Sequence, residues 1–381
     1  MKTVRFGIIG LGLMGRELAS AVARWCHLAD MGVRPVITAI CDSAPPPGRI
    51  EWFKENFPTI GQVCADYREL IANPEVDAVY CAVPHNLHAE LFGAIIRAGK
   101  HLLGEKPFGI DQAANDAILG AAREKPELVV RCSSEYPFFP GVQRIFQMAE
   151  TRSFGRIFEV NSGFQHSSDL DPSKPINWKR IVKFNGEYGV MGDLGMHACH
   201  VPFRSGWTPL NVRAVLSKIV AERPDGKGGM APCETWDNAN LLCQARDLDG
   251  VTFPWSLKTQ RIAPGQKNTW YLEIYGTKAS ARFSTKNPKR LEILEYSGGE
   301  QDWREIDTGY TPAFKTITGD IFEFGFTDSI LQMLAAFFYE VGHGRPLQPA
   351  AGCVTPGETA LSHRLFTAAL ASQKMQATVA V

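Results

Sequence analysis

The sequence predicts an α/β fold in two parts, and three observations carry this prediction. Over the first third of the chain, short apolar runs alternate with helical periods. These runs are continuously apolar, as strands buried on both faces of a parallel sheet require. After Ser134 the apolar runs lengthen, alternate with polar residues and follow one another across turns. We therefore expect an α/β domain over residues 1–134 and an α+β domain with a mostly antiparallel open sheet over 135–381.

The first part reads as strand–helix–strand units, which produce a parallel sheet. Leu18, Val22 and Trp25 recur on one helical face after the first apolar run, and a second helix is expected over about 111–124. The expected strands are 4–9, 35–41, 77–83, 101–104 and 128–132.

The second part has runs typical of an antiparallel sheet, separated by turns such as Pro224–Gly229. Helical periods return at 330–340 and 358–371. We assign the final helix, about 356–372, to this domain; the alternative is that it packs against the first domain. The expected strands are 157–164, 212–220, 251–260, 270–275 and 291–296.

Composition excludes several classes of protein. The 381 residues include 40 Lys plus Arg and 40 Asp plus Glu, so no basic field exists to hold nucleic acid or an anionic membrane. No apolar run is long enough to span a bilayer. The nine cysteines are odd in number and contain no C-x-x-C pair, which favours free thiols in the cytoplasm.

A glycine fingerprint opens the first helix. Gly10-Leu11-Gly12-Leu13-Met14-Gly15 is G-x-G-x-x-G, placed between a strand and a helix. Gly10 permits a tight turn, Gly12 admits a pyrophosphate to the backbone, and Gly15 lets the helix pack closely on the strand. The alternative is an ordinary glycine turn. The context favours a Rossmann dinucleotide-binding domain, with Leu13 and Met14 in the first helical turn beside the phosphates.

Asp42 ends the second strand. A carboxylate there accepts hydrogen bonds from the adenosine ribose and repels a 2′-phosphate, so NAD is expected rather than NADP. The interval from Gly15 to Asp42 is 27 residues, longer than the usual ~20. A longer connection through Ala29–Arg34 accounts for the difference; the alternative is an ordinary turn aspartate.

Polar residues follow further strands, where open parallel sheets bind ligands. Val83–Leu91 (VPHNLHAEL) and Glu105-Lys106-Pro107 end two of them, and Asp193-x-x-x-His197 stands at an expected helix start. Together with the fingerprint, these motifs resemble those of the glucose–fructose oxidoreductase, inositol dehydrogenase and MocA family. The resemblance extends over nearly the whole chain, although His85 stands where the family more often has Asn.

The resemblance implies a nicotinamide-dependent oxidoreductase acting on a sugar, glycoside or cyclic polyol. It places Lys106, Asp193 and His197 in the catalytic and substrate-binding site. Histidine chemistry suits removal of a hydroxyl proton near neutral pH, and a lysine suits stabilisation of the alkoxide. On the cofactor side the resemblance places Pro84, His85, His88, Glu105 and Lys106.

Residues 165–188 are polar and directly precede the D-x-x-x-H motif. His166, Trp178, Arg180 and Tyr188 supply aromatic faces and donors, which is what sugar binding requires. The alternative is a solvated loop.

No metal is expected, because His197, His200 and Asp193 lack an evident fourth ligand. Two alternative functions stay open: an NAD-dependent glycoside hydrolase of the same fold, and a non-catalytic dinucleotide-binding sensor. Apart from a small-molecule sugar or polyol, the expected partner is a second copy of the chain, in a homodimer or homotetramer.

Overall fold

The computed structural model describes residues 1–309, 312–319 and 321–381. Contacts divide it into two compact units. Unit 1 comprises Met1–Gly109, Ala113–Phe138 and the described part of 310–356; unit 2 comprises Ile110–Gln112, Phe139–Gly309 and Gly357–Val381.

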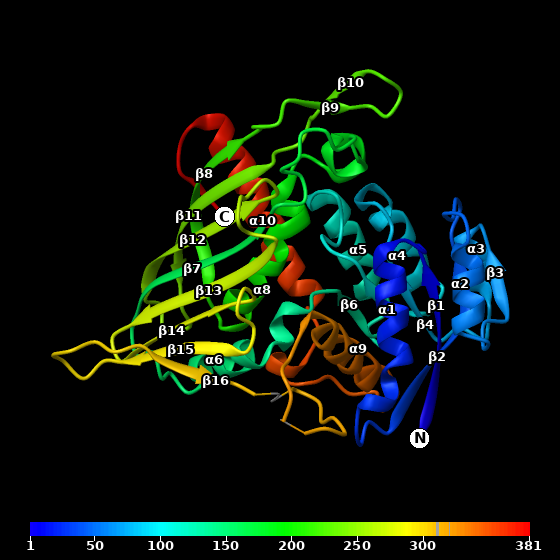
Figure 1. Cartoon of the computed structure of the whole chain (residues 1–381), viewed down its shortest axis with the longest axis horizontal. Helices are drawn as coiled ribbons and strands as arrows, with labels where there is room; N and C mark the ends of the chain where they lie inside the picture. The colour runs from blue at the N-terminus through cyan, green and yellow to red at the C-terminus, as the bar shows by residue number, and fades with distance from the viewer. Residues whose placement is uncertain (310–311, 320) are drawn as a thin grey trace. The chain divides into compact units, whose positions relative to one another are not determined.

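Unit 1 contains a parallel sheet of six strands in the order β3-β2-β1-β4-β5-β6, visible in blue to cyan in Figure 1. This confirms the predicted Rossmann architecture, including all five expected strands. The short β3 was not predicted, because three residues with little burial leave no apolar run. The strands are β1 Lys2–Ile9, β2 Val33–Cys41, β3 Gln62–Cys64, β4 Ala78–Cys81, β5 His101–Gly104 and β6 Val130–Cys132.

Helices cover both faces of this sheet, so alternate residues of a strand enter different cores. Phe6 and Ile8 of β1 pack with α1, α2 and α9, whereas Ile9 packs with α3, α4 and α5. The helices are α1 Leu13–Ala23, α2 Arg49–Asn56, α3 Tyr67–Ala72, α4 His88–Arg97, α5 Gln112–Glu124 and α9 Phe326–His343, with 3₁₀ turns η1 Trp25–His27, η2 His85–Leu87, η3 Tyr136–Phe138 and η6 Pro349–Ala351.

Helix α9 comes late in the chain yet belongs to unit 1. Its Phe338 contacts Phe6 edge-on, with ring centroids 5.1 Å apart, and Arg24 pairs with Asp328. The sequence pattern assigned this helix to the second domain, because periodicity shows that a helix has an apolar face but not which core covers it.

Unit 2 contains a sheet of nine strands in the order β16-β15-β14-β13-β7-β12-β11-β8-β17. All neighbours are antiparallel except β7 and β12, which confirms the predicted, mostly antiparallel sheet. The strands are β7 Ile157–His166, β8 Thr208–Ser217, β11 Asn238–Arg246, β12 Thr252–Gln260, β13 Asn268–Gly276, β14 Ala279–Ser284, β15 Arg290–Glu295, β16 Arg304–Asp307 and β17 Val379–Ala380, with a separate hairpin of β9 Glu222–Pro224 and β10 Met230–Pro232.

One face of this sheet is covered by helices and the other is more open. Along β11, Leu241 and Cys243 are buried while Leu242 and Gln244 between them are exposed, the period-two pattern of a half-covered sheet. The helices of unit 2 are α6 Pro140–Glu150, α7 Val182–Asn185, α8 Met196–Arg204 and α10 Pro356–Met375, with the 3₁₀ turn η4 Trp178–Arg180 and the π turn η5 Met191–Gly195.

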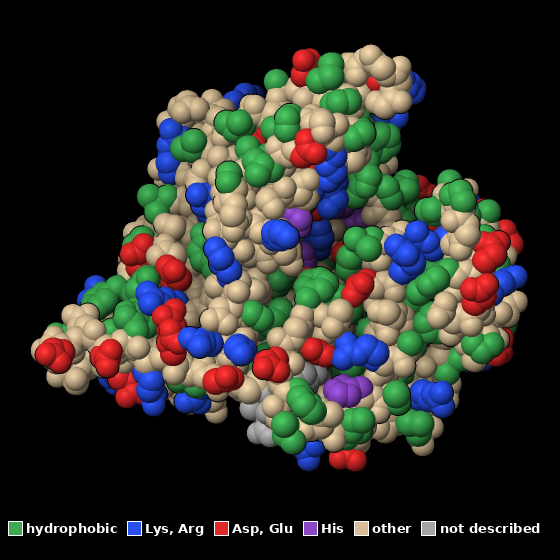
Figure 2. Space-filling model, in the orientation of Figure 1, with side chains coloured by type: hydrophobic (Ala, Val, Ile, Leu, Met, Phe, Trp, Pro, Cys, Tyr) green, Lys and Arg blue, Asp and Glu red, His purple; other side chains and the backbone are tan. Residues whose placement is uncertain are grey.

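Charged side chains of both signs are interspersed over the face seen in Figure 2, as the balanced composition implies. Among the described residues, no helix combines the length and the apolarity needed to cross a membrane.

Candidate active site

The glycine loop leaves room where a phosphate is expected and is packed tightly elsewhere. A Cβ on Gly10, whose φ is +92°, would lie 2.2 Å from the Ala82 carbonyl oxygen, and one on Gly15 would lie 2.2 Å from that of Gly10. A Cβ on Gly12 would meet nothing within 4 Å. Gly12 is also the N-cap of α1 and supplies no side-chain acceptor to the first amides of the helix. This cradle fits the pyrophosphate of a dinucleotide.

Asp42 lies beside that loop despite the long sequence interval, which η1 and the 28–32 segment take up. Its Oδ2 accepts a hydrogen bond from Leu11 N at 2.8 Å, and its Oδ1 accepts one from Ala44 N at 2.9 Å. Arg49 donates to the Leu11 carbonyl oxygen at 2.6 Å. Leu13 and Met14, exposed and half-buried, form the first turn of α1. Asp42 and Arg49 therefore hold the loop from two sides.

The segment that follows β4 carries two buried histidines, His85 and His88. Pro84 precedes the η2 turn, which carries a buried His85. His88 is fully buried: its Nε2 lies 3.0 Å from the Val83 carbonyl oxygen, and its ring stacks on Phe92 at 4.5 Å. The ring of His88 thus packs beneath the turn that carries Pro84 and His85, and its predicted cofactor contact stays a prediction.

Two buried carboxylates of unit 1, Glu105 and Glu135, lie in the neighbourhood of Lys106. Glu105 Oε1 accepts a hydrogen bond from the Tyr80 hydroxyl at 2.7 Å. Glu135, just after β6, is also buried. Burial, and then the charge of Glu105, raise the pKa of Glu135 to about 7, while the Lys106 ammonium acts in the opposite direction. The sequence prediction missed Glu135; its one signal was a carboxylate directly after a strand of the parallel sheet.

In unit 2, Asp193 and His197 lie on one continuous helical stretch. Asp193 belongs to the π turn η5, and His197 to the α8 helix that follows directly. Turns of π-helix are frequent at functional sites. A Cβ on Gly195 would lie 2.8 Å from Phe366 of α10, so a glycine is required for this close packing.

The Asp193 carboxylate has no exposed surface and carries a cation on each oxygen. Lys179 Nζ lies 2.8 Å from its Oδ1, and Arg261 donates to its Oδ2. The His197 ring stands edge-on to Phe164 with centroids 5.6 Å apart, and its carbonyl oxygen accepts a hydrogen bond from Trp270 Nε1 at 2.9 Å. A fixed anion and a packed imidazole thus stand on adjacent turns.

Two of the predicted sugar-binding residues are buried. Arg180 is fully buried, with its guanidinium 2.9 Å from Asp169 and 3.7 Å from Asp237. Tyr188 is buried too, and its hydroxyl lies 2.6 Å from Thr367 Oγ1 on α10. Arg180 pairs with carboxylates and Tyr188 with Thr367 inside unit 2, so neither side chain is exposed, and their predicted role in sugar binding stays a prediction.

The other two predicted sugar-binding residues, Trp178 and His166, are only partly buried. Trp178 is partly exposed, with the Lys179 ammonium 5.6 Å from its ring centroid. His166 Nδ1 accepts a hydrogen bond from Ser168 N at 3.0 Å. Burial first, and then the charges of Arg261 and Lys179, lower the pKa of His166 to about 4, so its ring is neutral at pH 7.

His200 is buried with no hydrogen-bond partner for either ring nitrogen, and burial lowers its pKa to about 3. It is therefore a packed, neutral imidazole. Among the described residues, no three His, Cys, Asp or Glu side chains gather as metal ligands.

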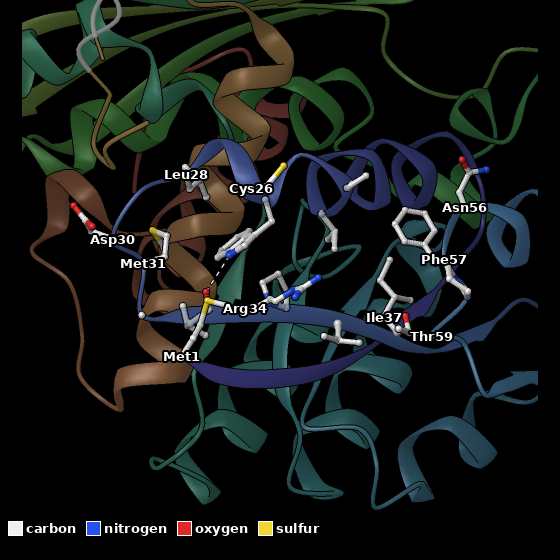
Figure 3. Close-up of a pocket in the computed structure, with 18 residues that line it drawn as sticks. Met1, Cys26, Leu28, Asp30, Met31, Arg34, Ile37, Asn56, Phe57 and Thr59 are labelled. Atoms are coloured by element: carbon white, nitrogen blue, oxygen red, sulfur yellow. Dashed lines mark hydrogen bonds between the residues drawn. The ribbon is translucent and has the colours of Figure 1, made fainter. Parts of the chain in front are cut away.

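A cavity of about 820 Å³ lies elsewhere in unit 1. Figure 3 shows Cys26, Leu28 and Met31 on one side of it and Arg34 and Ile37 of β2 on another. It borders the first half of β2, away from the carboxyl end where Asp42 and the glycine loop lie. Because parallel sheets bind ligands at their carboxyl ends, this cavity is not the dinucleotide site.

The comparisons with known proteins agree with the dinucleotide site inferred from the glycine loop. Residues 4–132 match the family described as "Oxidoreductase family, NAD-binding Rossmann fold" (GFO/IDH/MocA). The match covers nearly all of the parallel sheet of unit 1. The geometry of the glycine loop fits such an NAD-binding fold.

Curated relatives include levoglucosan dehydrogenase of Pseudarthrobacter phenanthrenivorans, 27% identical over 82% of this chain and 81% of the relative. Another is inositol 2-dehydrogenase of Rhizobium meliloti, 23% identical over 91% and 92%. A solved complex of levoglucosan dehydrogenase with NADH and levoglucosan covers both chains fully, with a TM-score of 0.87 at 24% identity. These likenesses extend over both units of the fold.

Proposed function

We propose that this protein is an NAD-dependent dehydrogenase that oxidises a hydroxyl carbon of a sugar, glycoside or cyclic polyol. The observation that carries the proposal is the Asp193 carboxylate, buried between two cations one turn ahead of His197. The relatives support the substrate class, since levoglucosan is an anhydrosugar and inositol is a cyclic polyol.

In this proposal Lys106, Asp193 and His197 are the catalytic residues. A bound nicotinamide would supply the hydride acceptor. The His197 imidazole accepts the hydroxyl proton, as suits a side chain whose ordinary pKa is about 6.5. The role assigned to the Lys106 ammonium is to stabilise the developing negative charge of an alkoxide. Asp193, held between Lys179 and Arg261, stabilises the imidazolium that results.

Trp178 and His166 are proposed as substrate contacts. An indole face packs against the C–H face of a sugar ring, and the neutral imidazole of His166 has a nitrogen for a hydroxyl. Pro84, His85 and Glu105 are proposed to shape the nicotinamide end of the cofactor site.

The proposal also includes a cofactor preference, a cellular location and an oligomeric state. NAD is preferred to NADP because Asp42 faces the glycine loop as an anion, while Arg49 is engaged with the Leu11 carbonyl oxygen. A cytoplasmic location is supported by nine cysteines that form no disulfide. A homodimer or homotetramer is supported by Val215 and Leu242, exposed apolar residues on the open face of the sheet.

The experiment is a screen of sugars, glycosides and polyols with NAD⁺ and, in parallel, NADP⁺, following the absorbance of the reduced cofactor. Oxidation of at least one polyol with NAD⁺ preferred supports the proposal. Cleavage of a glycoside without net cofactor reduction would replace it with the hydrolase reaction. Dinucleotide binding with neither reaction would favour the sensor.

A further inference from the structure

The Asp193 carboxylate depends on charges supplied by distant parts of unit 2. A buried carboxylate is unstable unless cations and donors surround it. Lys179 reaches Oδ1 from η4, and Arg261 reaches Oδ2 from the end of β12. The carboxylate itself has no exposed surface, so these contacts decide how it is oriented.

The two cations are held differently. The Lys179 side chain retains 30% of its exposure, whereas that of Arg261 retains 8%. Arg261 is fixed by further contacts: its Nε lies 3.1 Å from Asp169 Oδ2, and its Nη2 donates to Ser168 Oγ at 3.0 Å. Its backbone N donates to the Asp237 carbonyl oxygen at 3.0 Å. Arg261 is thus the anchored partner of Asp193.

Behind Arg261 the charges continue to alternate. Asp169 also meets Arg180 at 2.9 Å and Lys174 at 3.4 Å, and Arg180 meets Asp237 at 3.7 Å. These cations hold the pKa of Asp169 well below its ordinary range. Ile219 N and Val220 N in turn donate to the Asp237 carboxylate. The chain of ion pairs therefore ends on backbone amides, which cannot rotate away.

We propose that Arg261, braced by Asp169, is a positioning residue for the reaction: it fixes the orientation of the Asp193 carboxylate and balances its charge. This rests on the proposed function, because Asp193 acts there beside His197. The Arg261 guanidinium contacts two carboxylates through two different nitrogens. A lysine ammonium at the same position cannot reproduce this geometry. Charge and geometry at Arg261 can therefore be separated by substitution.

The test compares Arg261→Lys with Arg261→Gln in the full-length enzyme. Arg261→Lys should lower kcat about 10-fold, with the KM for NAD⁺ unchanged, because charge is kept and the bridge is lost. Arg261→Gln should lower kcat further. It should also move the acidic limb of the kcat/KM profile to higher pH, because an unbalanced Asp193 stabilises the imidazolium more strongly.

Two control variants separate positioning from folding. Arg223 is buried nearby and donates to the backbone carbonyl oxygens of Asp169, Asp171 and Lys174, so its contacts with these residues do not use their side-chain charges. Arg223→Lys should lower thermal stability and leave the acidic limb in place. Arg282 forms a more exposed ion pair with Glu292, and Arg282→Gln should change neither the thermal stability nor the acidic limb.

A second readout does not depend on turnover. Arg261, Lys179 and Lys174 lower the pKa of His166, and Asp169 raises it. NMR titration of the imidazole should therefore show the His166 pKa rising in Arg261→Gln and staying close to wild type in Arg261→Lys. If the wild type oxidises no polyol, the proposed function fails and this titration still tests the charge balance at Arg261. Wild-type kcat in both variants, or an unmoved titration in Arg261→Gln, would overturn the proposal.

Discussion

The glycine loop of unit 1 and the Asp193 cluster of unit 2 are built from different kinds of groups. In unit 1 the dinucleotide cradle is made of glycines and backbone amides, and Gly12 contributes by leaving space. In unit 2 the Asp193 cluster is made of buried charges drawn from η4, η5 and β12. A phosphate already carries its charge and needs oriented dipoles and access. A hydroxyl carries none, so the protein must bring charge to it.

Adding one or two atoms to the glycine loop should impair dinucleotide binding. Removing or displacing a charge should impair the Asp193 cluster. Substitutions in each region should therefore change different measurable quantities.

The largest effect is expected from His197→Ala. Loss of a general base costs typically about 10²–10⁴-fold in rate, so kcat should fall by that range. The dissociation constant of NADH, followed by fluorescence titration, should stay within about twofold of wild type, since the cradle belongs to unit 1. A loss of kcat smaller than tenfold would remove His197 from the proton-transfer role.

Asp193→Asn keeps the shape of the side chain and removes its charge. We expect kcat to fall about 10–100-fold, because the imidazolium loses its stabilising anion. The acidic limb of the kcat/KM profile should move to lower pH, opposite to its movement in Arg261→Gln. A profile that superimposes on wild type would show that Asp193 and His197 are not coupled.

Gly12→Ala tests the cradle. Gly12 has φ −69° and open space around a Cβ, so the variant should fold with an unchanged Tm. The added methyl group stands where the pyrophosphate approaches, and the KM for NAD⁺ should rise about tenfold or more. Gly10→Ala is the matched contrast: its Cβ would clash with the Ala82 carbonyl oxygen, so the variant should lose thermal stability instead. Equal behaviour of the two variants would contradict the geometry of the loop.

The smallest effect concerns Glu135. Its pKa is raised from 4.5 to about 7, so between these values the folded state holds a proton that the unfolded state has lost. Stability should therefore fall as pH rises through this window, and Glu135→Gln should remove that loss. At pH 8 we expect a Tm about 2–4 °C above wild type, and at pH 4.5 no difference.

Differential scanning calorimetry at the two pH values measures both Tm differences. Tyr80, Glu105 and Lys106 stay in place in the variant and serve as its fixed surroundings. A Tm difference that does not depend on pH would show that Glu135 is ionised in the folded protein.

The sequence by itself determined the parts of this protein that are local in the chain. The glycine fingerprint, the strand–helix alternation and the Glu105-Lys106-Pro107 turn each depend on neighbouring residues, and backbone geometry follows directly from them. The five strands predicted in unit 1 were found because each is a short, mostly apolar run.

The tertiary structure alone decided which distant residues share a core or a carboxylate. It placed α9 in unit 1, it buried Arg180 and Tyr188 inside unit 2, and it brought Arg261 to Asp193 over a sequence separation of 68. The physical reason is the same in each case. A helical period shows an apolar face but not what covers it, and an arginine after a strand looks alike in sequence whether it meets solvent or a buried carboxylate.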